Sequence, residues 1–257
     1  MKQLTINPFY GDMAEQAKSR LRLLLKMMPV HAYVVVRTEW TMLKVRVRSR
    51  RAAAAFAGQR GLMVNIGAGR LGKPGWVNVD AFPGPHVSCV YDCRKQLPFE
   101  DGSVRAIFCE HFFEHIDYTE EVPRFLSECR RVLEPGGRLR LIVPDAGRYI
   151  RAYAESGWDA LAALRTLGAD RSDPFLGGQY QTKMELINVL FRQGHEHKFA
   201  YDFETMAYVL DRYGFVGIQQ QAYGVTAASG LGLAIDEPAR AVESLYVEAT
   251  TPAAPSA

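Results

Sequence analysis

The sequence has no long hydrophobic run. The most apolar candidate, LLLKMMPVHAYVVV at 23–36, is interrupted by Lys26, Pro29 and His31. A transmembrane helix needs about 20 consecutive apolar residues. The opening stretch MKQLTINPFYGD also lacks the apolar core of a signal peptide. The sequence therefore predicts neither a membrane span nor a secretory signal.

Cysteine is scarce. The chain has four cysteines and no C-x-x-C pair: Cys89, Cys93, Cys109 and Cys129. Two of them lie in apolar segments of strand or helix character, where a reduced thiol serves as a small hydrophobic side chain. This usage indicates a chain with reduced thiols, and we expect a cytoplasmic location.

Acidic residues are nearly absent from the N-terminal part. Between Met13 and Arg60 eleven Lys and Arg side chains face only Glu15 and Glu39, although the whole chain carries a net charge of +3. One interpretation is a basic helix face that packs against the main domain. The other is contact with an anionic partner such as a membrane surface, a nucleic acid or a sugar phosphate. Few aromatic residues are interleaved here, which favours the first and argues against nucleic acid.

The region 1–60 is expected to form a basic, mainly helical extension. Apolar residues at helical spacing predict an amphipathic helix over 13–28. The stretch 32–56 is ambiguous, because YVVV and the alternating KVRVRSRR favour a strand whereas RRAAAAFAG favours a helix. Membrane contact at the periphery remains the alternative role of this extension.

From residue 61 the pattern changes to that of an α/β domain. Apolar runs of strand length at 61–66, 76–80, 87–91, 105–110 and 138–143 alternate with loops and helical stretches. A helix is predicted after Asp117 and is expected to end at EPGG, 134–137. Asp202 is predicted to cap a further helix, and strands are predicted at FVGIQQQ and at 243–249. We expect a domain over 61–249 and a disordered tail over 250–257.

The segment 146–200 does not have the pattern of a sheet. It contains two helical pieces, about 158–167 and 182–192, joined by a stretch rich in Gly, Asp and Pro. We interpret it as a helical insertion that covers the carboxyl edge of the sheet.

A glycine turn follows the first predicted strand, in VNIGAGRLGKPGWVNVDAF at 64–82. Gly67, Gly69 and Gly72 have the G-x-G-x-x-G spacing of dinucleotide-binding proteins. That fingerprint also needs a helix after the glycines and an acidic residue about 20 residues on. Here Asp80 follows Gly67 by only thirteen residues, and RLGKPGW leaves no room for a helix. An NAD(P)-dependent oxidoreductase therefore remains only an alternative.

Acidic residues end three of the predicted strands. Asp80, Asp92 and Glu110 are expected at the carboxyl edge, where open α/β sheets bind ligands. The Asp80 carboxylate can accept hydrogen bonds from both vicinal hydroxyls of a ribose. Asp92 can contact an exocyclic amine or cap a turn. The pattern therefore indicates a ligand that contains adenosine.

Eight segments in chain order resemble the class I S-adenosylmethionine-dependent methyltransferases, and specifically a small bacterial methyltransferase-11-like group. They are VNIGAG (64–69), KPGWVNVD (73–80), YD (91–92), LPFEDGSV (97–104), EHFFEHI (110–116), ECRRVLEPGGRLRLIVPD (128–145), HEHKFAYDFETM (195–206) and ESLYVEA (243–249). The resemblance implies a Rossmann-like, mostly parallel sheet of seven strands, in the order 3-2-1-4-5-7-6, flanked by helices. It also implies S-adenosylmethionine as the cofactor.

The resemblance further implies site roles. Gly67 and Gly69 would face the methionine part of the cofactor, Asp80 would hold the ribose, and Asp92 with the backbone at Cys93 would hold the adenine. The other residues expected at the cofactor are Asn65, Ala68, Ala81 and Glu110. Ala68 departs from many relatives, which have Cys there. Proteins of this group are often linked with polysaccharide or cell-surface glycan synthesis, so a small-molecule or saccharide-type acceptor is expected.

The segment HFFEH admits a second interpretation. His111, Glu114 and His115 match the H-x-x-E-H pattern of inverted zinc peptidases. In that pattern the two histidines bind zinc and Glu114 is the base. The preceding strand, however, places His111 at a strand end rather than inside a helix, and no third ligand beside the two histidines is evident. We therefore expect no metal, and expect His115 to be a hydrogen-bonded structural residue beside the transferred methyl.

Methyl transfer needs alignment of the acceptor with the reacting bond, and a hydroxyl or amine acceptor also needs a sink for its proton. The candidate catalytic residues are His111, Glu110 and Asp145. The candidate substrate contacts are His195, His197 and Tyr201 in the insertion and just after it. A cofactor-binding subunit without catalysis is the remaining alternative, because cofactor residues do not prove turnover.

Overall fold

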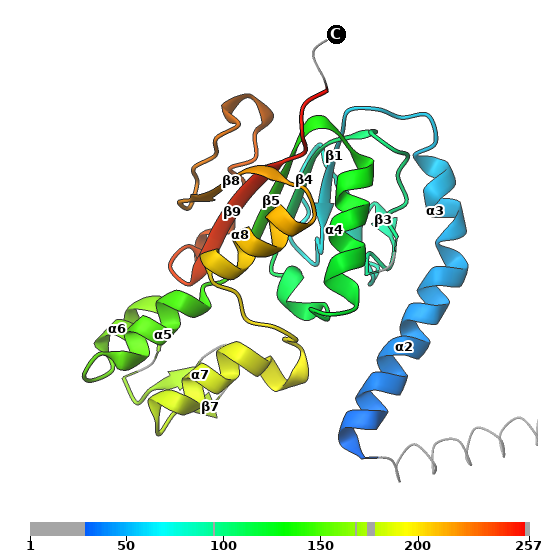
Figure 1. Cartoon of the computed structure of the whole chain (residues 1–257). Coiled ribbons are helices and arrows are strands. Elements are labelled where there is room, and N and C mark those ends of the chain that lie inside the picture. Colours follow the sequence, from blue (N-terminus) through cyan, green and yellow to red (C-terminus); the bar gives the residue numbers. More distant parts are fainter. Residues whose placement is uncertain (1–28, 95, 168, 174–177, 255–257) are drawn as a thin grey trace, which may run out of the picture. The chain divides into compact units, whose positions relative to one another are not determined.

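The computed structural model describes residues 29–94, 96–167, 169–173 and 178–254 (Figure 1). The predicted helix over 13–28 lies outside these residues. The chain divides into two compact units, Met1–Val47 and Arg48–Ala257. Among the residues described, no helix combines the length and the apolar character that crossing a bilayer requires.

The ambiguous stretch 32–56 is helical. Helix α2 spans Val30–Arg48 and α3 spans Arg50–Ala55. Strand propensity is a weak preference that depends on a neighbouring strand, whereas a helix satisfies its backbone hydrogen bonds internally. The valines and the alternating Arg-Val pattern therefore do not produce a strand here.

The second unit is built on a seven-stranded sheet. Its strands are β1 (Leu62–Ile66), β2 (Val77–Asp80), β3 (Cys89–Val90), β4 (Val104–Glu110), β5 (Leu133–Pro144), β8 (Val216–Gln221) and β9 (Ser244–Thr250). They lie in the order β3-β2-β1-β4-β5-β9-β8. Since β8 and β9 are the sixth and seventh strands of this sheet along the chain, the order is the predicted 3-2-1-4-5-7-6. The first five strands run parallel, and β9 runs antiparallel to both neighbours.

Two helices, α4 (Glu121–Val132) and α8 (Phe203–Arg212), cover one face of the sheet (Figure 1). The predicted apolar stripe of α4 is buried in the main core. Asp202 caps α8 as predicted, because its carboxylate accepts the N–H of Thr205. Helix α4 ends at Val132, before the predicted EPGG terminus. The EPGG segment instead pairs with the chain after β9, since Gly136 N–H donates to the carbonyl of Pro252.

The opposite face of the sheet has no crossover helix between β1 and β2 or between β2 and β3, all of which the structure describes. The segment 222–243, between β8 and β9, lies on this face instead. Its Ile235 packs against a small cluster of Phe108, Ile142 and Tyr246, beside Trp76. A long loop thus covers this face of the sheet, as helices cover the first face.

A buried arginine anchors this loop. The Arg140 guanidinium, on β5, is fully buried and donates to the carboxylates of Asp236 and Glu248 and to the carbonyl of Val225. The two carboxylates also accept backbone N–H groups of the loop. The charge is therefore paired and hydrogen-bonded on every side, as a charge in an apolar interior requires.

The insertion is helical, as predicted. It contains α5 (Ala146–Ala154), α6 (Asp159–Leu164), β6 (Ser172–Asp173), β7 (Gly178–Gln179), α7 (Lys183–Arg192) and the 3-10 turn η2 (Gln193–His195). The three α-helices lie together beyond the carboxyl end of β5 (Figure 1) and share a core that includes Tyr149, Leu161 and Leu186. A capping box of Thr182 and Glu185 starts α7.

The predicted disordered tail over 250–257 begins too early. Strand β9 extends to Thr250, and the next residue, Thr251, is buried. Its N–H donates to the carbonyl of Gly137 and its hydroxyl to that of Glu134. These bonds hold the chain beyond the sheet. Residues 255–257 lie outside the described part.

The four cysteines give a first testable prediction. All four are buried and free. Burial raises the pKa of the Cys89 thiol to about 11 and the pKa of the other three well above the ordinary value. The thiolate is the reactive form, so a thiol reagent at pH 8 should label no cysteine of the folded protein and four of the denatured one. Fast labelling of any thiol in the folded state, read by mass spectrometry, would contradict this packing.

Candidate functional site

The glycine turn after β1 is held tightly against β2. Gly67 and Gly69 have φ values of 74° and 50°, which glycine adopts without strain. The N–H groups of Gly67 and Ala68 both donate to the carbonyl of Val79, at 2.9 and 3.1 Å. A Cβ atom on Gly67 would lie 2.7 Å from the Cβ of Phe112. Glycine at this position therefore lets the loop after β4 approach the turn.

Asp80 closes the turn from the end of β2. One carboxylate oxygen accepts the N–H of Gly69 and the other that of Phe82, each at 2.8 Å. A carboxylate has about four lone-pair sites, so each oxygen can accept a further bond. The side chain is only half buried. The geometry therefore fits the predicted role of holding two ribose hydroxyls.

Asn65 supports the turn from below. Its amide donates to Oδ1 of Asn78 at 2.9 Å, and the same oxygen accepts the N–H of Lys73. The Asn65 side chain thus holds the loop that leads into β2. Ala68 is buried, and Ala81 lies half buried directly after Asp80. These residues shape the predicted cofactor site through backbone and packing.

Asp92 is committed to a partner within the chain. Its buried carboxylate pairs with Arg94, whose Nε and Nη2 atoms lie 2.9 and 3.1 Å from the two oxygens. Arg94 also lies 3.4 Å from Glu121. An adenine amine would therefore share Asp92 with a guanidinium. The neighbouring Cys93 is buried as well.

Glu110 lies under the loop 222–243 and does not line the cavity described below. Its carboxylate accepts the N–H of Glu237 at 3.0 Å and lies 4.0 Å from Nζ of Lys73. Burial raises the pKa of Glu110, and the Glu237 N–H and the Lys73 charge only partly offset this, so the pKa lies above its ordinary value. Glu110 thus contacts both the loop 222–243, through Glu237, and the loop before β2, through Lys73.

The raised pKa of Glu110 gives a prediction for stability. From the ordinary pKa upward, the folded state binds more protons than the unfolded state, so this group destabilises the fold increasingly as pH rises through that window. We expect the free energy of unfolding of Glu110→Gln, minus that of wild type, to increase from pH 4 to pH 7. Denaturation at a series of pH values measures it. The exposed Glu204→Gln is the control, and a wild-type advantage that grows with pH would contradict the assignment.

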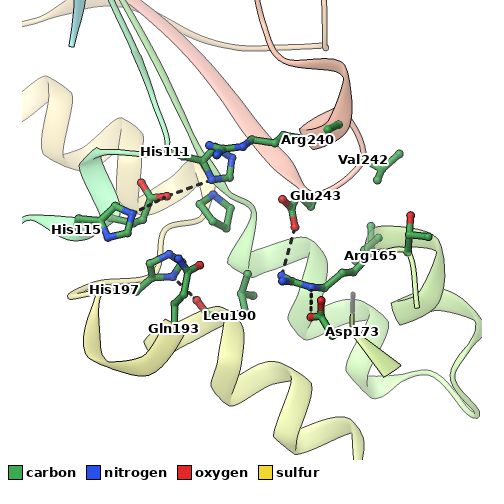
Figure 2. A pocket seen from close by; sticks show the side chains of 15 residues that line it. His111, His115, Arg165, Asp173, Leu190, Gln193, His197, Arg240, Val242 and Glu243 are labelled. Carbon is green, nitrogen blue, oxygen red and sulfur yellow. Dashed lines mark hydrogen bonds and ion pairs between the residues drawn. The ribbon is translucent and has the colours of Figure 1, made fainter. Parts of the chain in front are cut away.

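A cavity of about 270 Å³ opens below the end of β4 (Figure 2). Three parts of the chain line it: the loop after β4, the insertion, and the turn before β9. The lining polar residues are His111, Glu114, His115, Arg165, Thr166, Asp173, Gln193, His197, Arg240 and Glu243. The lining residues His111 and Glu114 flank Phe112 in the chain, and Phe112 approaches Gly67, so the loop after β4 reaches both the cavity and the glycine turn.

His111 projects into the cavity from a strained backbone. Its φ of 52° is rare for a residue with a side chain. Its Nε2 lies 2.9 Å from the hydroxyl of Ser244, and its Nδ1 lies 3.3 Å from a carboxylate oxygen of Glu114. Burial tends to raise the pKa of Glu114, but the adjacent His111 and His115 outweigh it and the net pKa is lowered. An ionised carboxylate therefore faces the His111 ring.

His115 and His197 meet edge to face, with ring centroids 4.9 Å apart. Nδ1 of His115 lies 3.2 Å from the carbonyl of Glu196, and Nδ1 of His197 lies 2.6 Å from that of Leu190. Burial lowers the pKa of His197. His197 thus lines the cavity. The structure describes the backbone of His195, which ends η2, but not its side chain.

The opposite wall carries charged residues that sequence reasoning missed. Nε of Arg165 lies 2.8 Å from Asp173, and Nη1 lies 3.7 Å from Glu243, which also accepts the hydroxyl of Tyr149. Arg240 lies beside His111 at the top of the view (Figure 2). Of these residues only Asp173 lies in the charged stretch GADRSDP (168–174), and nothing in the sequence indicated that Arg165, Arg240 or Glu243 face inward.

Two predicted residues lie away from the cavity. Asp145 caps α5, because its carboxylate accepts the N–H of Arg148 at 2.9 Å. Tyr201 is fully buried and packs against Phe113 and Phe199. Of the three candidate catalytic residues, only His111 lines the cavity. Asp145 and Tyr201 instead join the insertion to the sheet, through a bridge between their backbones.

Residues 78–141 match the family model described as "Methyltransferase domain". No curated protein matches the chain significantly in sequence. Among solved structures, an S-adenosylmethionine-dependent methyltransferase from Archaeoglobus fulgidus is 18% identical, with 82% of this chain and 94% of that one covered and a TM-score of 0.45. The 1,6-didemethyltoxoflavin-N1-methyltransferase of Burkholderia thailandensis is 13% identical, with coverages of 98% and 93% and a TM-score of 0.42.

At these identities and TM-scores, the substrates of those proteins say nothing about the substrate of this chain. The matched segment runs from β2 through most of β5 and includes Asp80, Asp92 and the loop that carries His111. It therefore contains the acidic strand ends and three residues of the cavity wall, His111, Glu114 and His115. Together with the strand order, it confirms the predicted domain type. Residues 78–141 of this chain thus belong to a methyltransferase domain.

Proposed function

We propose that this chain transfers a methyl group from S-adenosylmethionine to a hydroxyl group of a small-molecule or saccharide-type acceptor. The observation that carries the proposal is the position of His111, which opens into a polar cavity next to the glycine turn. The volume of about 270 Å³ is close to the lower end, about 300 Å³, of small-molecule sites. The acceptor, or the part of it that enters, is therefore small.

The cavity lining supports an acceptor rich in hydroxyl groups. Asp173 and Glu243 present acceptors, while Arg165 and Arg240 present donors. Hydroxyl groups both donate and accept, so they match a wall of mixed sign. The resemblance to a bacterial group linked with glycan synthesis supports a sugar hydroxyl in the same way. We propose a cytoplasmic location, supported by the free thiols.

The chain's own residues have three tasks in this reaction. The cofactor supplies the activated methyl group on its sulfonium. Asp80 and the glycine turn hold the nucleoside side of the site, and the cavity aligns the acceptor oxygen. His111 takes the acceptor's proton at Nε2, once the acceptor oxygen replaces the Ser244 hydroxyl as the partner of this nitrogen. Glu114, 3.3 Å from Nδ1, stabilises the resulting imidazolium.

The test is formation of S-adenosylhomocysteine with a panel of monosaccharides, nucleotide sugars, phenols and amines. We expect turnover with hydroxyl acceptors. His111→Gln should lower kcat by about 10²–10⁴-fold, the usual contribution of a general base, without changing the affinity for S-adenosylhomocysteine. His86→Gln, outside the cavity, is the control. Undiminished turnover in His111→Gln would contradict the mechanism, and cofactor binding without turnover on any acceptor would favour the non-catalytic alternative.

A further inference from the structure

Three potential metal ligands meet on one wall of the cavity. Glu114 and His115 come from the 3-10 turn η1 (Phe113–His115), and His197 follows η2 on the insertion. One ligand atom from each lies within 4.8 Å of the other two. In Figure 2 the rings of His115 and His197 face each other across this corner. The corner joins two parts of the chain that are distant in sequence.

Both histidines are fixed in the tautomer that a metal ion requires. The Nδ1 atoms of His115 and His197 face the carbonyls of Glu196 and Leu190, at 3.2 and 2.6 Å. A carbonyl only accepts, so each Nδ1 carries the proton. Each Nε2 then has its lone pair available. A backbone carbonyl behind the ring is the usual outer partner of a metal-binding histidine.

Glu114 is an incompletely satisfied buried carboxylate. Its side chain is 2% exposed, and no hydrogen bond from the described residues reaches either oxygen. Its ion-pair neighbours are Nδ1 of His111 at 3.3 Å and Nε2 of His115 at 4.0 Å. A buried charge is costly wherever its lone pairs lack close partners. A cation held jointly with the two histidines would remove that cost.

We propose that Glu114, His115 and His197 bind one divalent transition-metal ion of the Zn²⁺ type. Two imidazole nitrogens and one carboxylate oxygen form a donor set that suits zinc and leaves a fourth position open. Ligand atoms around a tetrahedral ion at about 2.1 Å are about 3.4 Å apart. Small side-chain rotations from the observed positions therefore suffice. The set departs from the H-x-x-E-H pattern, because His111 is engaged with Ser244 and the third ligand is His197.

The open position of the ion faces the cavity, since all three ligands line it. If the proposed function holds, this position would receive an oxygen of the acceptor. A bound ion lowers the pKa of such an oxygen and fixes its direction. The ion would then act beside His111, from the same wall. The binding of the ion itself is independent of that function.

The test is calorimetric titration of the full chain, first stripped with a chelator, with Zn²⁺ alone. We expect one ion per chain. His115→Ala and His197→Ala should each weaken binding by at least about 100-fold, beyond the ~10–100-fold cost of losing an outer partner. His86→Ala is the matched control, because it removes an exposed histidine outside the cavity. Far-UV circular dichroism and titration with S-adenosylhomocysteine check that each variant is folded.

Three results would overturn the site: no Zn²⁺ binding by wild type, unchanged affinity in both cavity variants, or an equal loss in His86→Ala. If a cavity variant fails to fold, Co²⁺ replaces Zn²⁺ in wild type, and absence of a visible band for coordinated Co²⁺ also overturns the site. Failure of the proposed function is distinguishable. If wild type binds Zn²⁺ but not S-adenosylhomocysteine, the proposed function is contradicted and the metal site stands. If it binds S-adenosylhomocysteine but not Zn²⁺, only the metal site is contradicted.

Discussion

Arg140→Met is expected to lower the free energy of unfolding by about 3–5 kcal/mol, the usual cost of removing one partner from a buried ion pair. The guanidinium is fully buried between Asp236 and Glu248. Without it, two carboxylates remain in a dry interior, where among the described residues only the backbone N–H groups of Gly224 and Ala227 still donate to them. The loop 222–243 would detach from the sheet or draw water in. Urea denaturation followed by circular dichroism measures the loss.

Two further variants separate the charge from the side chain. Arg138→Met makes the same replacement two residues earlier on β5, where the side chain is only half buried, and should cost less than about 1 kcal/mol. The combined variant Arg140→Met, Asp236→Leu, Glu248→Met should recover part of the loss, because a buried ion cluster is replaceable by apolar groups. Recovery will be incomplete, since the loop N–H groups then lack acceptors. Equal effects of Arg138→Met and Arg140→Met would contradict this account.

Gly67→Ala is expected to weaken binding of S-adenosylhomocysteine by at least about 30-fold, equivalent to about 2 kcal/mol. The φ of 74° costs a residue with a Cβ about 1–2 kcal/mol of stability. The loss of affinity has a separate cause, because the added atom would lie 2.7 Å from the Cβ of Phe112. Relief of that clash moves the loop that carries His111 and Glu114. Calorimetric titration measures the affinity.

Gly75→Ala is the matched control. Gly75 has a φ of 80°, so the backbone strain is equal, but a Cβ there would meet nothing within 4 Å. We expect a similar loss of stability and little loss of affinity. Gly67→Ala combined with Phe112→Ala should regain part of the binding. Equal losses of affinity at Gly67 and Gly75 would show that strain alone matters, and that the approach of Phe112 does not.

The sheet was predictable because each strand carries its own local signal. Short apolar runs bounded by Gly, Pro and Asp marked β1, β2 and β4, and the motif resemblance supplied their order. The helix α2 was not predictable, because its Val and Arg pattern has strand character, and local sequence does not show that these residues form a helix. The end of α4 was misplaced for a related reason. Pro135 and Gly136 indicated a break in the helix. The EPGG segment is extended because Gly136 hydrogen-bonds to Pro252, which lies far along the chain.

The site was predictable where it is local. Gly67, Gly69 and Asp80 lie within one turn and two strands, so their spacing revealed their geometry. Asp145 lies at the end of a strand, where a catalytic acid is expected, but its carboxylate caps the helix that follows. Asp92 was expected to face a ligand, and the partner it has instead, Arg94, lies only two residues on. A sequence indicates which residues reach an edge, but not which bonds they make there.

The cavity depends on contacts that no spacing reveals. His115 and His197 converge because the insertion folds back on the end of β4, where the N–H of Lys198 donates to the carbonyl of Glu114 at 2.7 Å. The sequence therefore offered no third ligand to accompany His111 and His115. Arg140 in RLRLIV was a visible anomaly, a charge in an apolar strand. Its partners Asp236 and Glu248 lie about a hundred residues away.

The central claim is that the glycine turn and Asp80 hold S-adenosylmethionine. The most direct measurement is calorimetric titration of the full chain with S-adenosylmethionine, S-adenosylhomocysteine and NADH, with Asp80→Ala and the exposed Asp211→Ala beside wild type. We predict micromolar binding of both adenosyl ligands by wild type and Asp211→Ala, loss of both in Asp80→Ala, and no binding of NADH. Binding of NADH, or adenosyl affinity that survives in Asp80→Ala, would contradict the claim.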